Sequence, residues 1–182
     1  YAIYRPRYIL PDYNVYIEKG CEFLELPAPK NLDDVLDGLL ILYSHVPSIT
    51  TFPVYIGRLD VLLDPFITDE EQDYIKIKRF LNHVDKTVPD SFCHANIGPY
   101  DTKAVRLILK SVIELEAPTP NMTIRYDKSK TSREFAELAA KACLLVSKPS
   151  FANDAYYISD LGEQYGIASC YNALPECGGA YT

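Results

Sequence analysis

Short strand-like segments alternate with helix-like segments through most of this chain, and this alternation limits its fold more than any other feature. Residues rich in β-branched and aromatic side chains occur at 50–56, 91–97 and 122–126. A segment with a helical apolar stripe follows each of them. Because strands joined by helices of this length pair in parallel, the sequence predicts an α/β layer or barrel.

Capping signals predict where the helices begin. Thr68 and Thr131 each precede a glutamate by three residues, which is the capping-box pattern. Asn31 and Asp101 are further predicted N-caps. The helix after Asn31 is expected to end near His45. Each of these helices is expected to turn its apolar face toward a buried core.

The chain is expected to be one domain with two parts. Residues 1–48 combine a tyrosine- and proline-rich arm with the first helix, and residues 49–182 contain the alternating strands and helices. Within the arm, the segment 14–18 is predicted as a strand. Because the chain begins with Tyr1 and ends soon after Gly178-Gly179, we expect a fragment of a longer polypeptide.

The C-terminal region is predicted as a strand, a helix and a second strand. Pro149 ends the preceding helix, because proline lacks the amide proton and restricts the residue before it. Asn153 or Asp154 can cap the next helix, and Gly166 suits the position just past its end. The second strand then leads to Cys170, at the start of a loop. Loops held by a rigid scaffold often carry functional residues.

This region resembles the thiyl-radical cysteine region of the glycyl radical enzymes. Members of that family carry a P-x-F-x-N-D stretch, a helix and a Y-G-I-x-x-C stretch, and residues 117–126 are similar to the P-N-x-T-[IV] strand that precedes them. The matching residues are Pro149, Phe151, Asn153, Asp154, Tyr165, Gly166, Ile167 and Cys170. The closest resemblance is to the YjjI-type subgroup of these pyruvate formate-lyase-like proteins.

The resemblance implies a portion of a ten-stranded α/β barrel with the cysteine loop threaded into its centre. Cys170 would take hydrogen from a small-molecule substrate as a thiyl radical, and Cys177 is a candidate second relay. No cofactor is expected in this chain itself. A glycyl radical would be installed by a separate activating enzyme that uses S-adenosylmethionine and an iron–sulfur cluster. Because the family's R-V-x-G-[YF] pattern is absent from residues 1–182, this chain alone is expected to be inactive.

One position departs from the better-known members that this region resembles. In the radical dehydratases and lyases, a glutamate two residues after the cysteine works as a general base. Asn172 stands there in this chain and cannot take a proton. Glu176 could supply a carboxylate from the same loop, although an exposed glutamate is the default interpretation. Carbon–carbon cleavage, elimination and rearrangement therefore all stay open, in a lyase or a formate acetyltransferase-like enzyme.

Several polar residues are candidate substrate contacts. His94 and Asn96 end a predicted strand, where sites of α/β proteins usually collect, and a purely structural role for His94 is equally open. Arg125 lies on a predicted buried strand, so it needs a carboxylate or phosphate partner, from a substrate or within the protein. Asn153 and Asp154 match the family's N-D pair, and a helix cap explains them equally well. Arg58, Asp60 and Asp64 are expected to pair with one another.

Charge and cysteine content exclude other classes of function. The net charge of −7 argues against nucleic-acid binding, which depends on clustered lysine and arginine. The five cysteines form no C-x-x-C pair, so no metal site is expected, and their odd number favours a reducing, cytoplasmic compartment. No segment is apolar over a length that would span a membrane. A homodimer stays open.

Two alternatives compete with this interpretation. An anaerobic ribonucleotide reductase would share the barrel and the cysteine but needs nucleotide phosphate sites, which the sequence does not show. A degenerate barrel kept as a scaffold would use Cys170 only for packing, as a small buried hydrophobic residue.

Overall fold

The computed structural model describes residues 13–89, 92–168 and 172–174, the last three by their backbone alone. Four strands form a parallel sheet in chain order: β1 (Val54–Ile56), β2 (Cys93–Ile97), β3 (Asn121–Tyr126) and β4 (Ser150–Asn153). The predicted α/β class is confirmed.

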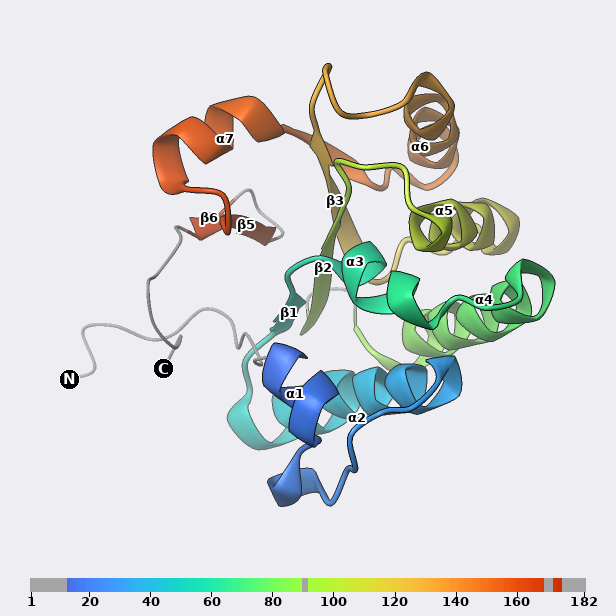
Figure 1. The fold of residues 1–182 in the computed structure, drawn as a ribbon, viewed down its shortest axis with the longest axis vertical. Helices are drawn as coiled ribbons and strands as arrows, with labels where there is room; N and C mark the ends of the chain where they lie inside the picture. The colour runs from blue at the N-terminus through green and yellow to red at the C-terminus, as the bar shows by residue number, and fades with distance from the viewer. Residues whose placement is uncertain (1–12, 90–91, 169–171, 175–182) are drawn as a thin grey trace.

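The helices between these strands cover one face of the sheet. α3 (Leu59–Leu63), η2 (Asp64–Phe66) and α4 (Glu70–Thr87) connect β1 to β2; α5 (Lys103–Leu115) and α6 (Arg133–Val146) make the next two connections. Right-handed crossovers that always step in the same direction place their helices on the same face. Figure 1 shows α4, α5 and α6 together on one side of the strands. This order suits part of a barrel, and the ten-stranded barrel itself stays a prediction.

Side chains alternate between the two faces of each strand. On β2, Cys93, Ala95 and Ile97 join the hydrophobic core beneath the helices, and Met122 and Ile124 of β3 do the same. The core continues into the apolar stripes that the sequence predicted for α4, α5 and α6. Its fully buried helix residues include Ile77, Leu81, Val105, Ile108, Val112 and Ala139.

The N-terminal part of the chain differs from its prediction. Residues 14–18 lie in a helix, α1 (Tyr13–Lys19), followed by η1 (Glu22–Leu24), and the predicted strand there is wrong. The reason is helical spacing: Tyr13, Tyr16 and Ile17 lie on one side of α1 and pack inward. α2 (Leu32–Thr50) is capped by Asn31 as predicted, but it continues past His45 and leaves only three residues for β1.

Three helix caps lie one residue later than predicted. Asp69 caps α4 in place of Thr68, Thr102 caps α5 in place of Asp101, and Ser132 caps α6 in place of Thr131. Tertiary contacts explain the last shift, because the Thr131 hydroxyl donates to the carbonyl of Pro99, across the loops that follow β2 and β3.

The C-terminal region folds back over the other face of the sheet. α7 (Asp154–Leu161) begins directly after β4, with Asn153 as its N-cap. The helix ends at Gly162, which has φ 92°, and not at Gly166 as predicted. β5 (Gly166–Ala168) and β6 (Asn172–Leu174) then form an antiparallel hairpin that contacts β2. Figure 1 places this hairpin and α7 on the side of the sheet away from α4, α5 and α6.

None of the helices in the described part of the chain combines the length and apolar character needed to cross a membrane.

Candidate functional site

The face of the sheet turned away from the helices is polar and buried. The residues whose side chains alternate with the core residues on β1, β2 and β3 are Tyr55, His94, Asn96, Thr123 and Arg125, and each residue as a whole is at most 4% exposed. Parallel strands usually bury apolar side chains on both faces. Because buried polar groups need partners, this face points to a specific set of contacts.

Asn96 connects the sheet to the C-terminal hairpin. Its Nδ2 donates to the carbonyl oxygen of Ile167 over 2.7 Å, and its Oδ1 accepts the Ile167 amide over 2.9 Å. The Tyr55 hydroxyl donates to the same Oδ1 over 2.6 Å. One carboxamide thus binds both backbone groups of a single strand residue.

Tyr55 also explains the glycine of the Y-G-I stretch. A Cβ atom at Gly166 would lie 2.2 Å from the Tyr55 hydroxyl oxygen and 2.6 Å from its Cζ. The ring of Tyr55 therefore packs directly on the backbone of β5. Sequence reasoning did not single out Tyr55; the available signal was its central position in a strand whose neighbours, Val54 and Ile56, are core residues.

Arg125 and Asp154 form a buried ion pair. The Arg125 Nε donates to Asp154 Oδ1 over 2.7 Å, and the two side chains are 5% and 1% exposed. The other guanidinium nitrogens donate to the carbonyls of Glu163 and Tyr165, over 2.9 and 3.4 Å. Of the two partners that the sequence left open for Arg125, the structure shows the internal carboxylate.

Besides Lys130, whose Nζ lies 3.4 Å from Asp154 Oδ2, Tyr165 belongs to this cluster. Its hydroxyl donates to Asp154 Oδ1 over 2.8 Å, and the Arg125 guanidinium lies 4.1 Å from the centre of its ring. Burial, followed by the hydrogen bond to the Asp154 carboxylate, raises the pKa of Tyr165 well above its ordinary value. The cluster ties the loop before β5 to β3 and α7, so it fixes the hairpin at a second place.

The other predicted residues of the P-x-F-x-N-D stretch have local roles. The Asn153 side chain accepts the Tyr156 amide over 3.2 Å, which is an N-cap. Phe151 is 42% exposed and packs edge-on against Tyr126, with ring centres 6.3 Å apart. Neither side chain is part of the Arg125 cluster.

His94 lies on the same face of β2 as Asn96 and is 1% exposed. Its backbone carbonyl accepts the Tyr43 hydroxyl from α2 over 3.0 Å. A substrate contact by His94 stays a prediction.

The structure does not test the loop residues. Cys170, Cys177 and Glu176 lie outside the described residues, and Asn172 is described by its backbone only. That backbone pairs with Ala168, so residues 169–171 connect the two paired ends of β5 and β6. Cys170 is the middle residue of this connection.

Acidic residues gather where β1 and β2 end. Asp60 is fully buried, accepts the Gly98 amide over 3.1 Å, and has its pKa raised to about 6, mainly by burial. Asp64 accepts the Ala104 amide. The predicted pairing is wrong: among the described residues, Arg58 lies in an ion pair with neither carboxylate. The described residues also contain no group of three or more His, Cys, Asp or Glu side chains that could hold a metal ion.

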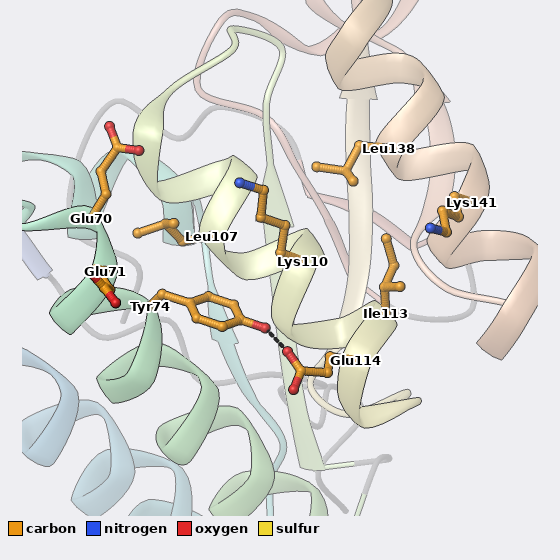
Figure 2. Close-up of a pocket in the computed structure, with 9 residues that line it drawn as sticks. All are labelled: Glu70, Glu71, Tyr74, Leu107, Lys110, Ile113, Glu114, Leu138 and Lys141. Carbon is orange, nitrogen blue, oxygen red and sulfur yellow. Dashed lines mark hydrogen bonds between the residues drawn. The ribbon is translucent and has the colours of Figure 1, made fainter.

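A groove of about 520 Å³ lies on the opposite side of the sheet, between α4, α5 and α6 (Figure 2). Leu107, Ile113 and Leu138 line it, and charged residues of both signs surround them. The Tyr74 hydroxyl donates to Glu114 across it. None of the residues on the polar face of the sheet reaches this groove.

Comparison with known proteins assigns the chain to a group. The model of the family "Glycyl radical enzyme YjjI-like" matches residues 1–182. An uncharacterized protein of Haemophilus influenzae is 92% identical over 182 residues, which cover 100% of this chain and 35% of that protein. The uncharacterized protein YjjI of Escherichia coli is 46% identical over 185 residues, which cover 100% of this chain and 36% of that protein. The chain spans about a third of the length of these relatives.

Proposed function

The chain belongs to the YjjI-like glycyl radical enzyme family, and from this we propose that Cys170 is the residue that takes hydrogen from a small-molecule substrate as a thiyl radical. One observation supports this most: the two strands that flank residues 169–171 are held against a buried polar face of a parallel sheet by Asn96. A hairpin fixed in this way suits a residue that must meet a substrate in a defined position.

The chemistry makes particular demands on the protein. A glycyl radical, supplied from outside residues 1–182 and installed by an activating enzyme, would oxidise the thiol. The Cys170 thiyl radical would then take a hydrogen atom from a C–H bond of the substrate and return one to the product radical, so that the thiyl radical is restored after each turnover. It becomes a thiol again when it takes a hydrogen atom from the glycine and regenerates the glycyl radical. The surrounding residues have to exclude water and offer no reactive group of their own.

Three buried polar residues among those described support the proposal. Asn96, Arg125 and Asp154 have their polar groups bonded within the protein and are at most 4% exposed. Of the candidate substrate contacts, His94 shares the polar face. Asn172, Glu176 and the candidate relay Cys177 follow Cys170 within seven residues of the sequence. We retain these four for the substrate and the radical, and assign Asn153, Asp154, Asn96 and Arg125 to holding the structure.

The proposal can be tested without a known substrate. The whole polypeptide that the gene encodes is activated anaerobically by its activating enzyme and observed by electron paramagnetic resonance in H2O and in D2O. The single hydrogen on a glycyl radical splits its signal into a doublet. If the radical exchanges hydrogen with a solvent-exchangeable thiol, the splitting collapses in D2O.

Cys170→Ala is expected to keep the doublet in D2O, because the exchanging thiol is missing. Cys143→Ala on α6 is the matched control, a half-buried cysteine of the helix layer, and its splitting should collapse as in the unchanged protein. Collapse in Cys170→Ala would overturn the proposal, and a preserved doublet in Cys177→Ala alone would move the role to that residue. A protein that never acquires a radical would favour a scaffold function.

A further inference from the structure

The groove between α4, α5 and α6 exposes apolar side chains on the outer surface of the helix layer (Figure 2). Leu107, Ile113 and Leu138 form its floor. Two large apolar residues of the flanking helices add to this surface, because Ile75 on α4 is 54% exposed and Leu145 on α6 is 48% exposed. Exposed apolar surface surrounded by polar residues is typical of an interaction site.

Helical spacing places both exposed residues at the border of the groove. Ile75 follows Glu71 by four residues, and Leu145 follows Lys141 by four residues, and both Glu71 and Lys141 line the groove. Residues four apart are neighbours on a helix surface. The apolar floor and these border residues therefore belong to one face, which we call the α4–α5–α6 face.

The charges on the α4–α5–α6 face are separated by sign. Glu70 and Glu71 occupy the first turn of α4, whereas Lys110 lies on α5 and Lys141 on α6. All four residues are exposed, and none of them has an ion-pair partner within the described part of the chain. Figure 2 shows the two glutamates on one side of the groove and Lys141 on the other. These charges are available to a partner.

The face is also balanced in charge, unlike the chain as a whole. Three glutamates and two lysines line the groove, and Lys78 adds a third positive charge through its ion pair with Glu114. The whole chain carries a net charge of −7. Two copies of such an acidic protein repel each other over most of their surfaces. On the α4–α5–α6 face this repulsion is small.

The arrangement of the charges is complementary to that of a second copy. α4, α5 and α6 run in the same direction, because each connects neighbouring strands of one parallel sheet. A two-fold axis through α5, perpendicular to the helix layer, lays α4 of one copy over α6 of the other in the reverse direction. The first turn of α4, with Glu70 and Glu71, then faces the second half of α6, where Lys141 lies. A two-fold axis makes each such contact twice.

We propose that the α4–α5–α6 face is the interface through which two copies of this protein form a two-fold symmetric dimer. The floor and border residues supply the apolar contacts. Glu71 pairs with the partner subunit's Lys141, and this pairing sets the register of the two copies. The inference does not depend on the function proposed for Cys170.

The test compares charge variants of the whole polypeptide by sedimentation equilibrium over a wide range of protein concentration. The unchanged protein is expected to form a dimer that dissociates on dilution. Glu71→Lys and Lys141→Glu each place like charges opposite each other at both symmetric contacts, so each is expected to raise the dissociation constant about tenfold or more. The double variant Glu71→Lys/Lys141→Glu restores opposite charges with their signs exchanged. It is expected to dimerise nearly as tightly as the unchanged protein.

Lys128→Glu is the matched control. Lys128 is an exposed residue of the loop after β3, does not line the groove, and changes the net charge as much as Lys141→Glu does. Its dissociation constant is expected to equal that of the unchanged protein. Because Glu71 and Lys141 are exposed as well, all these variants are expected to fold, and their urea midpoints check this.

Three results would overturn the proposal. A monomer at every concentration would leave the face to another part of the polypeptide. A dimer that tolerates both single changes would show that the copies meet elsewhere. A double variant no tighter than the single variants would show that the two residues are not opposite each other.

Discussion

Removing the carboxylate of Asp154 should be the most destabilising change on the polar face. Asp154→Ala leaves the Arg125 guanidinium without its ion-pair partner in a site where the two side chains are 5% and 1% exposed. Losing one partner of a buried ion pair costs about 3–5 kcal/mol. The Tyr165 hydroxyl also loses its acceptor, while the carbonyls of Glu163 and Tyr165 still bind the guanidinium. We therefore expect a loss of about 4 kcal/mol in the free energy of unfolding.

Urea unfolding of the whole polypeptide measures this loss as a shift of the midpoint at constant slope. Glu137→Ala is the matched control, because its ion pair with Arg133 is exposed (64% and 86%) and should contribute less than about 0.5 kcal/mol. The double variant Arg125→Met/Asp154→Ala leaves no unpaired charge. Its loss in the free energy of unfolding should therefore be smaller than the sum of the losses of the two single variants. The reasoning is refuted if Asp154→Ala costs no more than Glu137→Ala.

Two further changes test other parts of the site. Gly166→Ala should lower the free energy of unfolding by about 1–3 kcal/mol through overpacking, because its Cβ would meet the Tyr55 hydroxyl at 2.2 Å. Adding Tyr55→Leu to the same chain should recover part of this loss. If Gly166→Ala is as stable as the unchanged protein, the contact between Tyr55 and Gly166 is contradicted. Asp60→Asn tests the pKa that burial raises from 3.8 to about 6. Because the folded state holds this proton more tightly than the unfolded state, the stability from Asp60 is complete below about pH 4 and is lost as the pH rises through about 6, a fall of about 3 kcal/mol. The urea midpoint of Asp60→Asn should not fall over this pH range. If the variant and the unchanged protein show the same dependence of the midpoint on pH, Asp60 is not the source of the fall.

Local signals in the sequence predicted the sheet and its helices well. Short β-branched segments and capping residues depend on neighbours a few positions away, so β2, β3 and the helices after them could be placed to within a residue or two. α1 was missed because its tyrosines and isoleucine favour strands by composition, while their spacing is helical. The cap of α6 lies one residue later than predicted because the Thr131 hydroxyl binds the carbonyl of Pro99 in another loop.

The partners within the site could not be predicted from local patterns. Arg125 meets Asp154 across 29 positions of the chain, and Asn96 meets Ile167 across 71. The sequence showed that a buried arginine needs an anion, but not which one. Family resemblance named Tyr165, Gly166 and Asp154 together; their contacts give the physical reason, since each helps to hold the segment before Cys170.

The polar face also matters during synthesis, because the strands of the sheet leave the ribosome before the hairpin that covers them. The four described strands of the sheet have been synthesised once the ribosome passes Asn153, and the hairpin that covers them follows, so a nascent chain presents Asn96 and Arg125 uncovered. Because domains form as the chain leaves the ribosome, this face spends an interval in contact with water, which can hydrate its polar groups. An apolar face exposed during the same interval would tend to associate with other apolar surfaces. The polar lining of this face thus lowers the tendency of the partly synthesised chain to aggregate before the hairpin covers it.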